Sequence, residues 1–159
     1  MYSNYIMKVN MINPPPNSSK KKVVYCAMSA DIIHPGHINI LKIANKYGKV
    51  FVGLLTDKAI SEYKKPPIFN YNQRKTIVKS IRFVDKVIKQ NSLSYVPNLK
   101  KIKPNYVIHG DDWKTGVQKK IRKDVIATLK KWKGKLIEPK YTSRISSSLV
   151  KKKVLNKWS

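Results

Sequence analysis

The sequence predicts an α/β fold: a doubly wound parallel sheet of about five strands with helices on both faces. Apolar runs alternate with amphipathic stretches from residue 23 onward, the pattern of strand–helix–strand units. The first run, Val23 to Met28, is apolar throughout, as expected for a strand buried on both faces. Polar motifs follow several of these runs. In a parallel sheet such strand ends share one edge, where ligands bind.

The elements are expected in strict alternation. Strands are expected at residues 23–29, 50–55, 84–88, 105–109 and 135–138. Helices are expected at residues 37–47, 57–62, 71–82, 94–101, 117–132 and 146–154. In the first helix, Pro35 suits the opening turn, apolar residues recur from Ile38, and Gly48 is a stop signal.

Length and composition indicate one globular domain. The chain has 159 residues, of which 42% are hydrophobic, enough for a core of its own. Residues 1–21 are polar and include three consecutive prolines, so we expect a disordered tail there and one domain over residues 22–156. No apolar run is long enough to span a membrane, and the amino terminus lacks the features of a secretory signal. The single cysteine, Cys26, excludes an internal disulfide and favours a cytoplasmic protein with a buried, inert thiol.

The net charge is extreme, at +26 from 34 basic and 8 acidic residues. Such a charge is compatible with a nucleic-acid partner. The lysines are nevertheless spread along the chain, with short blocks at 20–22 and 151–153, and no aromatic-basic ribonucleoprotein motif accompanies them. A general lysine-rich composition therefore explains the charge better, and nucleic acid is not favoured as the primary ligand.

The segment His34-Pro35-Gly36-His37 follows the first strand and opens the first helix. Two imidazoles three residues apart in a first turn share one face of the helix. The same turn has backbone N–H groups without an intrahelical partner, and this end of a helix favours phosphate. We therefore expect His34 and His37 to bind the phosphates of a nucleotide. The alternative is a capping role for His34 and a surface position for His37.

Acidic residues are scarce, and three lie just past expected strand ends: Asp31, Asp111 and Asp112. In so basic a chain these carboxylates are candidates for contact with a metal, a ribose or a base amine. Turns and helix caps also use aspartate, so a purely structural role is the alternative, above all for Asp57.

Three motifs occur in order: His34-Pro-Gly-His37, Gly110-Asp-Asp-Trp113 and Ile145-Ser-Ser-Ser148. With them the chain resembles the cytidylyltransferase family of HxGH nucleotidyltransferases over residues 23–155, most closely the domains associated with phosphoenolpyruvate mutase in phosphonate pathways. The resemblance implies a Rossmann-like sheet and transfer of CMP from CTP to a phosphate- or phosphonate-bearing small molecule, with release of pyrophosphate. It also implies Mg²⁺ as cofactor, with Asp31 a candidate outer partner, and a homodimer.

The resemblance assigns roles by position. The expected catalytic residues are His34, His37, Lys64, Lys65 and Arg82. The expected nucleotide-binding residues are Ser29, Ala30, Asp31, Gly36, Arg74, Asp111, Thr142, Arg144, Ser146, Ser147 and Ser148. Within these sets, Asp111 matches the residue that holds the cytidine, and the two lysines lie in segment 63–70, which we expect to act as a lid. Arg82 and Asp85 match a motif linked to the active site and to dimer contact.

The last motif departs from the family pattern at two positions. The family has a glycine where Arg144 stands, and its general pattern has an arginine where Tyr141 stands. A glycine there suits a turn with positive φ, which costs other residues about 1–2 kcal/mol. Arg144 therefore strains this turn, supplies a guanidinium to the phosphates, or blocks closure of the site.

Other functions remain open at this point. One is an adenylyltransferase of the same fold, against which Gly110-Asp-Asp-Trp113 argues. Another is a basic RNA-binding module that has lost turnover, favoured by Arg144 and the charge of +26. A relative of the aminoacyl-tRNA synthetases is disfavoured by the short chain and the missing second signature.

Overall fold

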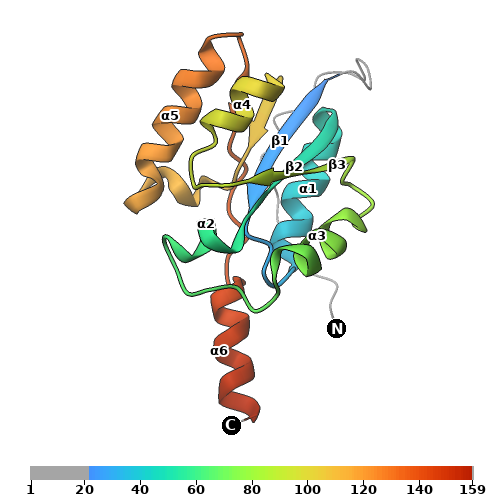
Figure 1. Ribbon diagram of the computed structural model, residues 1–159, viewed down its shortest axis with the longest axis vertical. Helices are drawn as coiled ribbons and strands as arrows, with labels where there is room; N and C mark the ends of the chain where they lie inside the picture. The colour runs from blue at the N-terminus through green and yellow to red at the C-terminus, as the bar shows by residue number, and fades with distance from the viewer. Residues whose placement is uncertain (1–21, 159) are drawn as a thin grey trace.

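The chain folds around one five-stranded parallel sheet with the strand order β3-β2-β1-β4-β5 (Figure 1). A computed structural model describes residues 22–158, so the tail expected at residues 1–21 lies outside the described residues. The strands are β1 (Val23–Met28), β2 (Lys49–Leu55), β3 (Lys86–Gln90), β4 (Tyr106–Ile108) and β5 (Lys135–Ile137). The predicted doubly wound α/β fold is confirmed.

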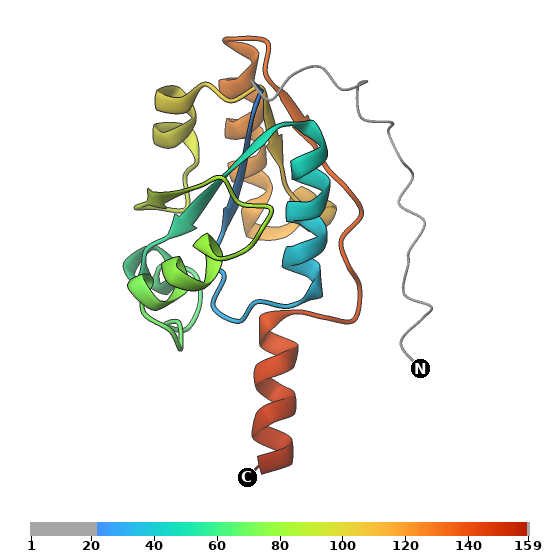
Figure 2. The ribbon, with the colours of Figure 1, turned by 90° about the vertical axis from the view of Figure 1, so that its right-hand side faces the viewer.

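Helices cover both faces of this sheet (Figure 2). The α-helices are α1 (Pro35–Tyr47), α2 (Asp57–Ser61), α3 (Tyr71–Lys79), α4 (Val96–Ile102), α5 (Lys119–Lys130) and α6 (Ser147–Trp158). Two short 3-10 helices, η1 (Asp111–Lys114) and η2 (Gly116–Gln118), precede α5. On one face, α1 and α3 bury Leu41 and Val78 against the sheet. On the other face, α4 and α5 bury Leu99 and Val125.

Several helix ends differ from the sequence prediction. The first helix begins at Pro35 because the His34 side chain caps it. The third helix ends at Lys79, three residues early, and a turn leads from it to β3. In this turn the Asp85 carboxylate accepts from the N–H of Val50 at 2.7 Å. The stretch expected as one helix over residues 117–132 is divided. The 3-10 helix η2 begins at Gly116, whose φ of 72° favours glycine, and α5 follows from Lys119.

The strand order creates a switch point between β1 and β4. The chain moves outward from β1 through β2 to β3, then returns to the other side of β1 with β4. The connections that leave β1 and β4 therefore diverge to opposite faces, and they open a crevice at the carboxyl ends of these two strands. The segments after Met28 and after Ile108 meet at this edge.

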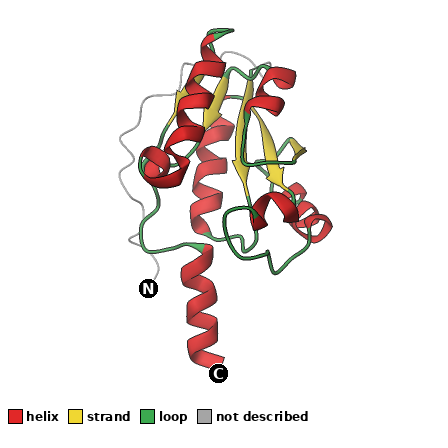
Figure 3. Ribbon diagram, turned by 60° about the vertical axis from the view of Figure 1, so that its left-hand side comes forward, coloured by secondary structure: helices red, strands yellow, loops and turns green. Residues whose placement is uncertain are grey.

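The last helix, α6, extends away from the body of the domain (Figure 3). Its first turns are attached by a hydrogen bond from the Ser147 hydroxyl to the Ile32 carbonyl and by an ion pair between Lys151 and Asp31. Its later residues include exposed apolar side chains such as Val154, which is 51% exposed. Within residues 22–158, no helix combines the length and apolarity needed to cross a membrane.

Candidate functional site

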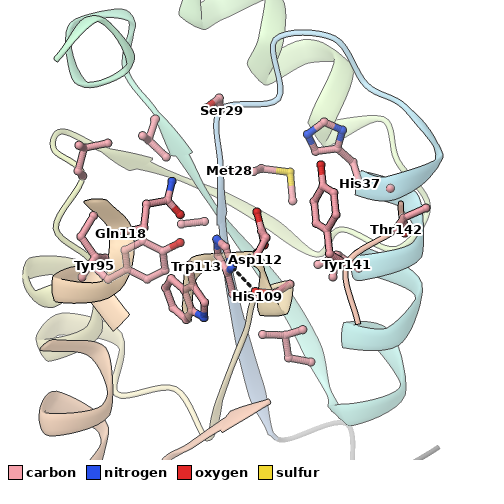
Figure 4. Close-up of a pocket in the computed structure, with 18 of the residues that line it drawn as sticks. Met28, Ser29, His37, Tyr95, His109, Asp112, Trp113, Gln118, Tyr141 and Thr142 are labelled. Atoms are coloured by element: carbon pink, nitrogen blue, oxygen red, sulfur yellow. Dashed lines mark hydrogen bonds and ion pairs between the residues drawn. The ribbon is translucent and has the colours of Figure 1, made fainter. Parts of the chain in front are cut away.

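A cavity of about 230 Å³ lies at the carboxyl ends of β1 and β4 (Figure 4). Five predicted site residues line it: Ser29, His34, Gly36, His37 and Thr142. The lining also includes Asp112, one of the three candidate carboxylates. It further includes polar or aromatic residues that the sequence analysis did not assign to the site: Tyr63, Tyr95, His109, Trp113, Gln118 and Tyr141. The cavity thus occupies the strand edge that the sequence predicted.

His34 and His37 form a close pair on the first turn of α1, with ring centroids 4.0 Å apart. Nδ1 of His34 accepts from the N–H of Gly36 at 3.1 Å, so His34 is also the helix cap. Nδ1 of His37 accepts from the N–H of His34 at 3.3 Å. A ring nitrogen that accepts carries no proton, so the proton of each neutral imidazole is on Nε2. Each ring therefore retains one donor, the type of group that phosphate oxygens bind.

Burial keeps both imidazoles neutral at physiological pH. It lowers the pKa of His34, and it lowers the pKa of His37 to about 3, with smaller contributions from His34 and the Lys64 ammonium. A neutral ring has the single Nε2 proton that the hydrogen bonds assign to it.

Gly36 is required between the two histidines because a neighbouring ring fills the space beside it. A Cβ at this position would lie 2.8 Å from Cε1 of His34 and 3.7 Å from Cβ of Thr142. Thr142 is itself attached to α1, since the Asn39 amide donates to its hydroxyl at 3.3 Å. A side chain at position 36 would displace the His34 ring from its capping position.

Asp31 is 2% exposed and lies outside the cavity lining. Its Oδ1 accepts from the N–H groups of Ile68 and Phe69, and its Oδ2 accepts from the Lys151 ammonium of α6. Burial alone would raise the pKa of Asp31, but Lys151 and the two backbone donors outweigh burial and lower it. Both oxygens accept hydrogen bonds within the protein, so Asp31 connects segment 63–70 to α6.

Arg74 is fully buried, and its guanidinium connects three parts of the chain. It donates to the carbonyl of Ser29 at 2.6 Å, to the carbonyl of Phe69 at 2.9 Å and to the carboxylate of Asp57 at 2.6 Å. These bonds hold the turn after β1, where Ala30 has a φ of 51°. Arg74 therefore positions the site without lining the cavity, and Asp57 has the structural role considered as its alternative.

Segment 63–70 borders the cavity through Tyr63, whose hydroxyl hydrogen-bonds with the hydroxyl of Ser29 at 2.7 Å. Lys64 and Lys65 are exposed, and Nζ of Lys64 lies 5.1 Å from the centroid of the Tyr63 ring. The other end of the segment is attached at Phe69. The two lysines therefore lie in a stretch with fixed ends beside the cavity, and its closure as a lid stays a prediction.

Two further predicted residues do not reach the cavity. Arg82 is exposed in the turn after α3, with its guanidinium 4.7 Å from the centroid of the Phe83 ring. Asp111 accepts from the N–H of Tyr141 at 2.8 Å and so holds the last motif beside η1. The adjacent carboxylate, Asp112, is the one that lines the cavity.

The last motif turns at Arg144 and then starts α6. Arg144 is exposed with a φ of 62°, so the positive φ expected from the missing glycine is present. Ser146 accepts from the N–H of Leu149 through its hydroxyl at 3.1 Å, as a capping residue does. Ser147 is bonded to the carbonyl of Ile32, and Ser148 is exposed. None of these side chains lines the cavity.

One wall of the cavity is formed by a fixed aromatic stack. The rings of His109 and Trp113 are parallel within 9°, with centroids 3.9 Å apart. The Trp113 indole donates to the carboxylate of Glu138 at 2.7 Å, and Arg122 holds the same carboxylate. The position of His109, directly before Gly110-Asp-Asp-Trp113, was the one sequence signal that could have identified it.

These features are typical of nucleotide-binding proteins. They are a Rossmann-like parallel sheet, a cavity at its strand ends, and paired imidazole donors at the amino terminus of a helix. A family model described as cytidylyltransferase-like matches residues 26–153. The chain belongs to this cytidylyltransferase-like family of nucleotidyltransferases.

Individual relatives include transferases with different products. The chain is 32% identical over 101 residues to the ethanolamine-phosphate cytidylyltransferase of Mus musculus, covering 61% of this chain and 24% of that protein. It is 35% identical over 86 residues to the FAD synthase of Methanopyrus kandleri, covering 52% of this chain and 57% of that protein. The chain thus spans about a quarter of the first relative and somewhat over half of the second. These relatives do not single out the domains associated with phosphoenolpyruvate mutase.

A solved structure supports the fold. The lipopolysaccharide core biosynthesis protein from Thermoplasma volcanium GSS1 superposes with a TM-score of 0.66 at 23% identity, covering 77% of this chain and 98% of that chain. At this identity the likeness establishes the shared architecture alone.

Proposed function

We propose that this chain transfers CMP from CTP to a phosphate- or phosphonate-bearing small molecule and releases pyrophosphate. The observation that carries the proposal is the pair of Nε2 donors, from His34 and His37, at the strand-end cavity. Similarity to ethanolamine-phosphate cytidylyltransferases supports CTP as the nucleotide. The motif Gly110-Asp-Asp-Trp113 supports the same choice.

The proposed reaction needs no protein nucleophile. An oxygen of the acceptor's phosphate or phosphonate forms a bond to the α-phosphorus of CTP as the bond from that phosphorus to pyrophosphate breaks. The protein contributes positioning and neutralisation of charge. His34 and His37 donate to the phosphate oxygens that gain charge, and Lys64 or Lys65 adds a cation from segment 63–70.

The proposal includes Mg²⁺ as an ion bound to the triphosphate of the nucleotide. Among residues 22–158 there is no group of three or more His, Cys, Asp or Glu that could hold a metal ion. Both carboxylate oxygens of Asp31, the residue expected beside the metal, are bonded within the protein. Mg²⁺ would therefore be held chiefly by the oxygens of the triphosphate, and the roles assigned here belong to the protein's own donors.

Adenylyl transfer is the second candidate function. FAD contains an adenylyl group, and several relatives are FAD synthases at 32–35% identity. The residues at the phosphates would have the same roles, because CTP and ATP share the triphosphate. The two functions differ in the nucleobase and in the acceptor.

A pyrophosphate-release assay with Mg²⁺ tests both candidates. CTP, ATP, GTP and UTP are each combined with a panel of phosphorylated and phosphonate alcohols and amines and with FMN. We expect release with CTP. Release confined to ATP would replace cytidylyl by adenylyl transfer, and no release with any pair would reject both.

The His37→Ala variant should lower turnover by about 100-fold or more. The control variant Lys42→Ala, at an exposed residue of the same helix, should leave turnover unchanged. Sedimentation of the same preparation tests the expected homodimer.

A further inference from the structure

The cavity has two chemically different ends (Figure 4). His34 and His37 supply donors at one end. At the other end lie His109, Asp112 and the aromatic ring of Trp113. Among the described residues that line the cavity, Asp112 carries the only formal charge, although the chain as a whole has a net charge of +26. A wall with a carboxylate and no lysine or arginine suits a group that donates hydrogen bonds, not a phosphate.

The His109 ring has the opposite proton arrangement from the other two histidines. Its Nδ1 lies 2.8 Å from the carbonyl oxygen of Gly110. A carbonyl only accepts, so Nδ1 carries the proton and Nε2 is an acceptor. Burial lowers the pKa of His109 despite the opposing effects of Gly110 and Asp112, so the ring is neutral at physiological pH.

The acceptor atom of His109 is available to a ligand. Throughout the described part of the chain, every fully buried side-chain nitrogen or oxygen has a hydrogen-bond partner. The described residues provide none to Nε2 of His109, so this atom is open to the cavity that the ring lines. Stacking on Trp113 and the bond to Gly110 fix the plane of the ring. An acceptor held in this way needs no reorganisation on binding.

We infer that Nε2 of His109 is the acceptor site for an N–H group of a substrate. The Asp112 carboxylate lies on the Nδ1 side of the same ring, with its Oδ1 3.7 Å from Nδ1. Two sources offer this chemistry: the exocyclic amine of the nucleobase and the ammonium group of the acceptor molecule. The inference deepens the proposed function and rests on it for the choice of ligands. It assigns the amine selectivity to a residue outside the motifs that bind phosphate.

Binding measurements on single ligands test the inference independently of catalysis. Isothermal titration calorimetry compares CTP with UTP, which has a carbonyl in place of the amine, and 2-aminoethylphosphonate with 2-hydroxyethylphosphonate. Three proteins are compared: wild type, His109→Leu, which removes the acceptor at similar volume, and His109→Gln, which keeps an acceptor oxygen. Thermal unfolding of each variant checks that the cavity wall is folded.

We expect the wild type to prefer the amine in at least one pair by tenfold or more. His109→Leu should lose this preference and His109→Gln should recover part of it. Loss in the CTP and UTP pair assigns the site to the nucleobase, and loss in the phosphonate pair assigns it to the acceptor. No amine preference in the wild type, or the same preference in His109→Leu, overturns the inference. The pyrophosphate assay is separate: its failure rejects the proposed function and leaves these binding ratios as measured.

Discussion

The position of a single proton on each histidine decides whether its remaining ring nitrogen donates or accepts a hydrogen bond. His34 and His37 accept backbone N–H groups through Nδ1 and therefore donate through Nε2. His109 donates to a carbonyl through Nδ1 and therefore accepts through Nε2. The same residue type thus serves both ends of one site, and the local backbone geometry sets the difference.

The lowered pKa of His37 should make stability depend on pH. Its pKa falls from 6.5 to about 3 in the folded chain. Between these values the unfolded chain binds a proton at position 37 that the folded chain does not, so the free energy of unfolding falls as the pH decreases. The His37→Gln variant should lack this contribution, which reaches about 1.4 kcal/mol per pH unit.

Urea unfolding at a series of pH values measures the effect. The two proteins should have parallel stability curves above pH 7, where His37 is neutral in both states, and should diverge below about pH 6.5. Curves that stay parallel down to pH 4 would contradict the assignment of a neutral, buried imidazole.

Arg144 is expected to strain the turn before α6. Its φ of 62° lies in the left-handed region, which costs a residue with a Cβ about 1–2 kcal/mol. Arg144→Gly removes this strain, while the greater freedom of glycine in the unfolded chain offsets part of the gain. The free energy of unfolding should therefore rise by about 1 kcal/mol. Thermal unfolding should show a rise of about 2–4 °C. The matched control, Ser143→Gly, should bring no gain, because Ser143 has no positive φ; equal behaviour of the two variants would refute the strain.

At the scale of elements, buried polar side chains connect segments that are distant in the sequence. Arg74 on α3 holds the turn after β1, and Asp31 in that turn holds segment 63–70 and α6. The segment with the two exposed lysines and the start of the last helix are therefore attached to the same carboxylate. Movement of either element must act on Asp31.

Removal of Lys151 should destabilise the domain through Asp31. Lys151→Met leaves a carboxylate that is 2% exposed without its cation, with two backbone donors remaining. We expect a loss of about 1–3 kcal/mol in the free energy of unfolding. The double variant Asp31→Asn with Lys151→Met should recover part of it, because the buried charge is gone. Lys152→Met, an exposed neighbour, should change stability by less than about 0.5 kcal/mol; an equal loss there would show that the ion pair contributes little.

The molecule as a whole carries an unbalanced charge of +26. The described structure contains few acidic side chains to balance this charge. Three of them, Asp31, Asp57 and Glu138, each form an ion pair with one particular cation. Most lysines are exposed, so their mutual repulsion acts against the compact state.

Screening by salt should therefore stabilise the fold. Raising sodium chloride from about 10 mM to about 0.15 M shortens the Debye length from about 30 Å to about 8 Å. We expect the melting temperature to rise by several degrees. A variant with Lys42, Lys100 and Lys120 changed to glutamate should respond less, since these exposed sites then contribute attraction. A melting temperature that does not rise with salt would indicate that the lysines are spaced widely enough to avoid repulsion.

The sequence by itself determined the sheet, the order of its elements and the histidine pair at the strand edge. These features are local: apolar runs mark buried strands, and Pro35 marks the first turn of α1. Only the tertiary structure decided the positions of Asp31 and Arg74. The motifs predicted that both contact the nucleotide, whereas in the fold both are buried outside the cavity lining. It also brought His109 to the cavity. The reason is physical: the partners of Asp31 lie up to 120 residues away, at Lys151, and long-range pairs leave no periodicity in the chain.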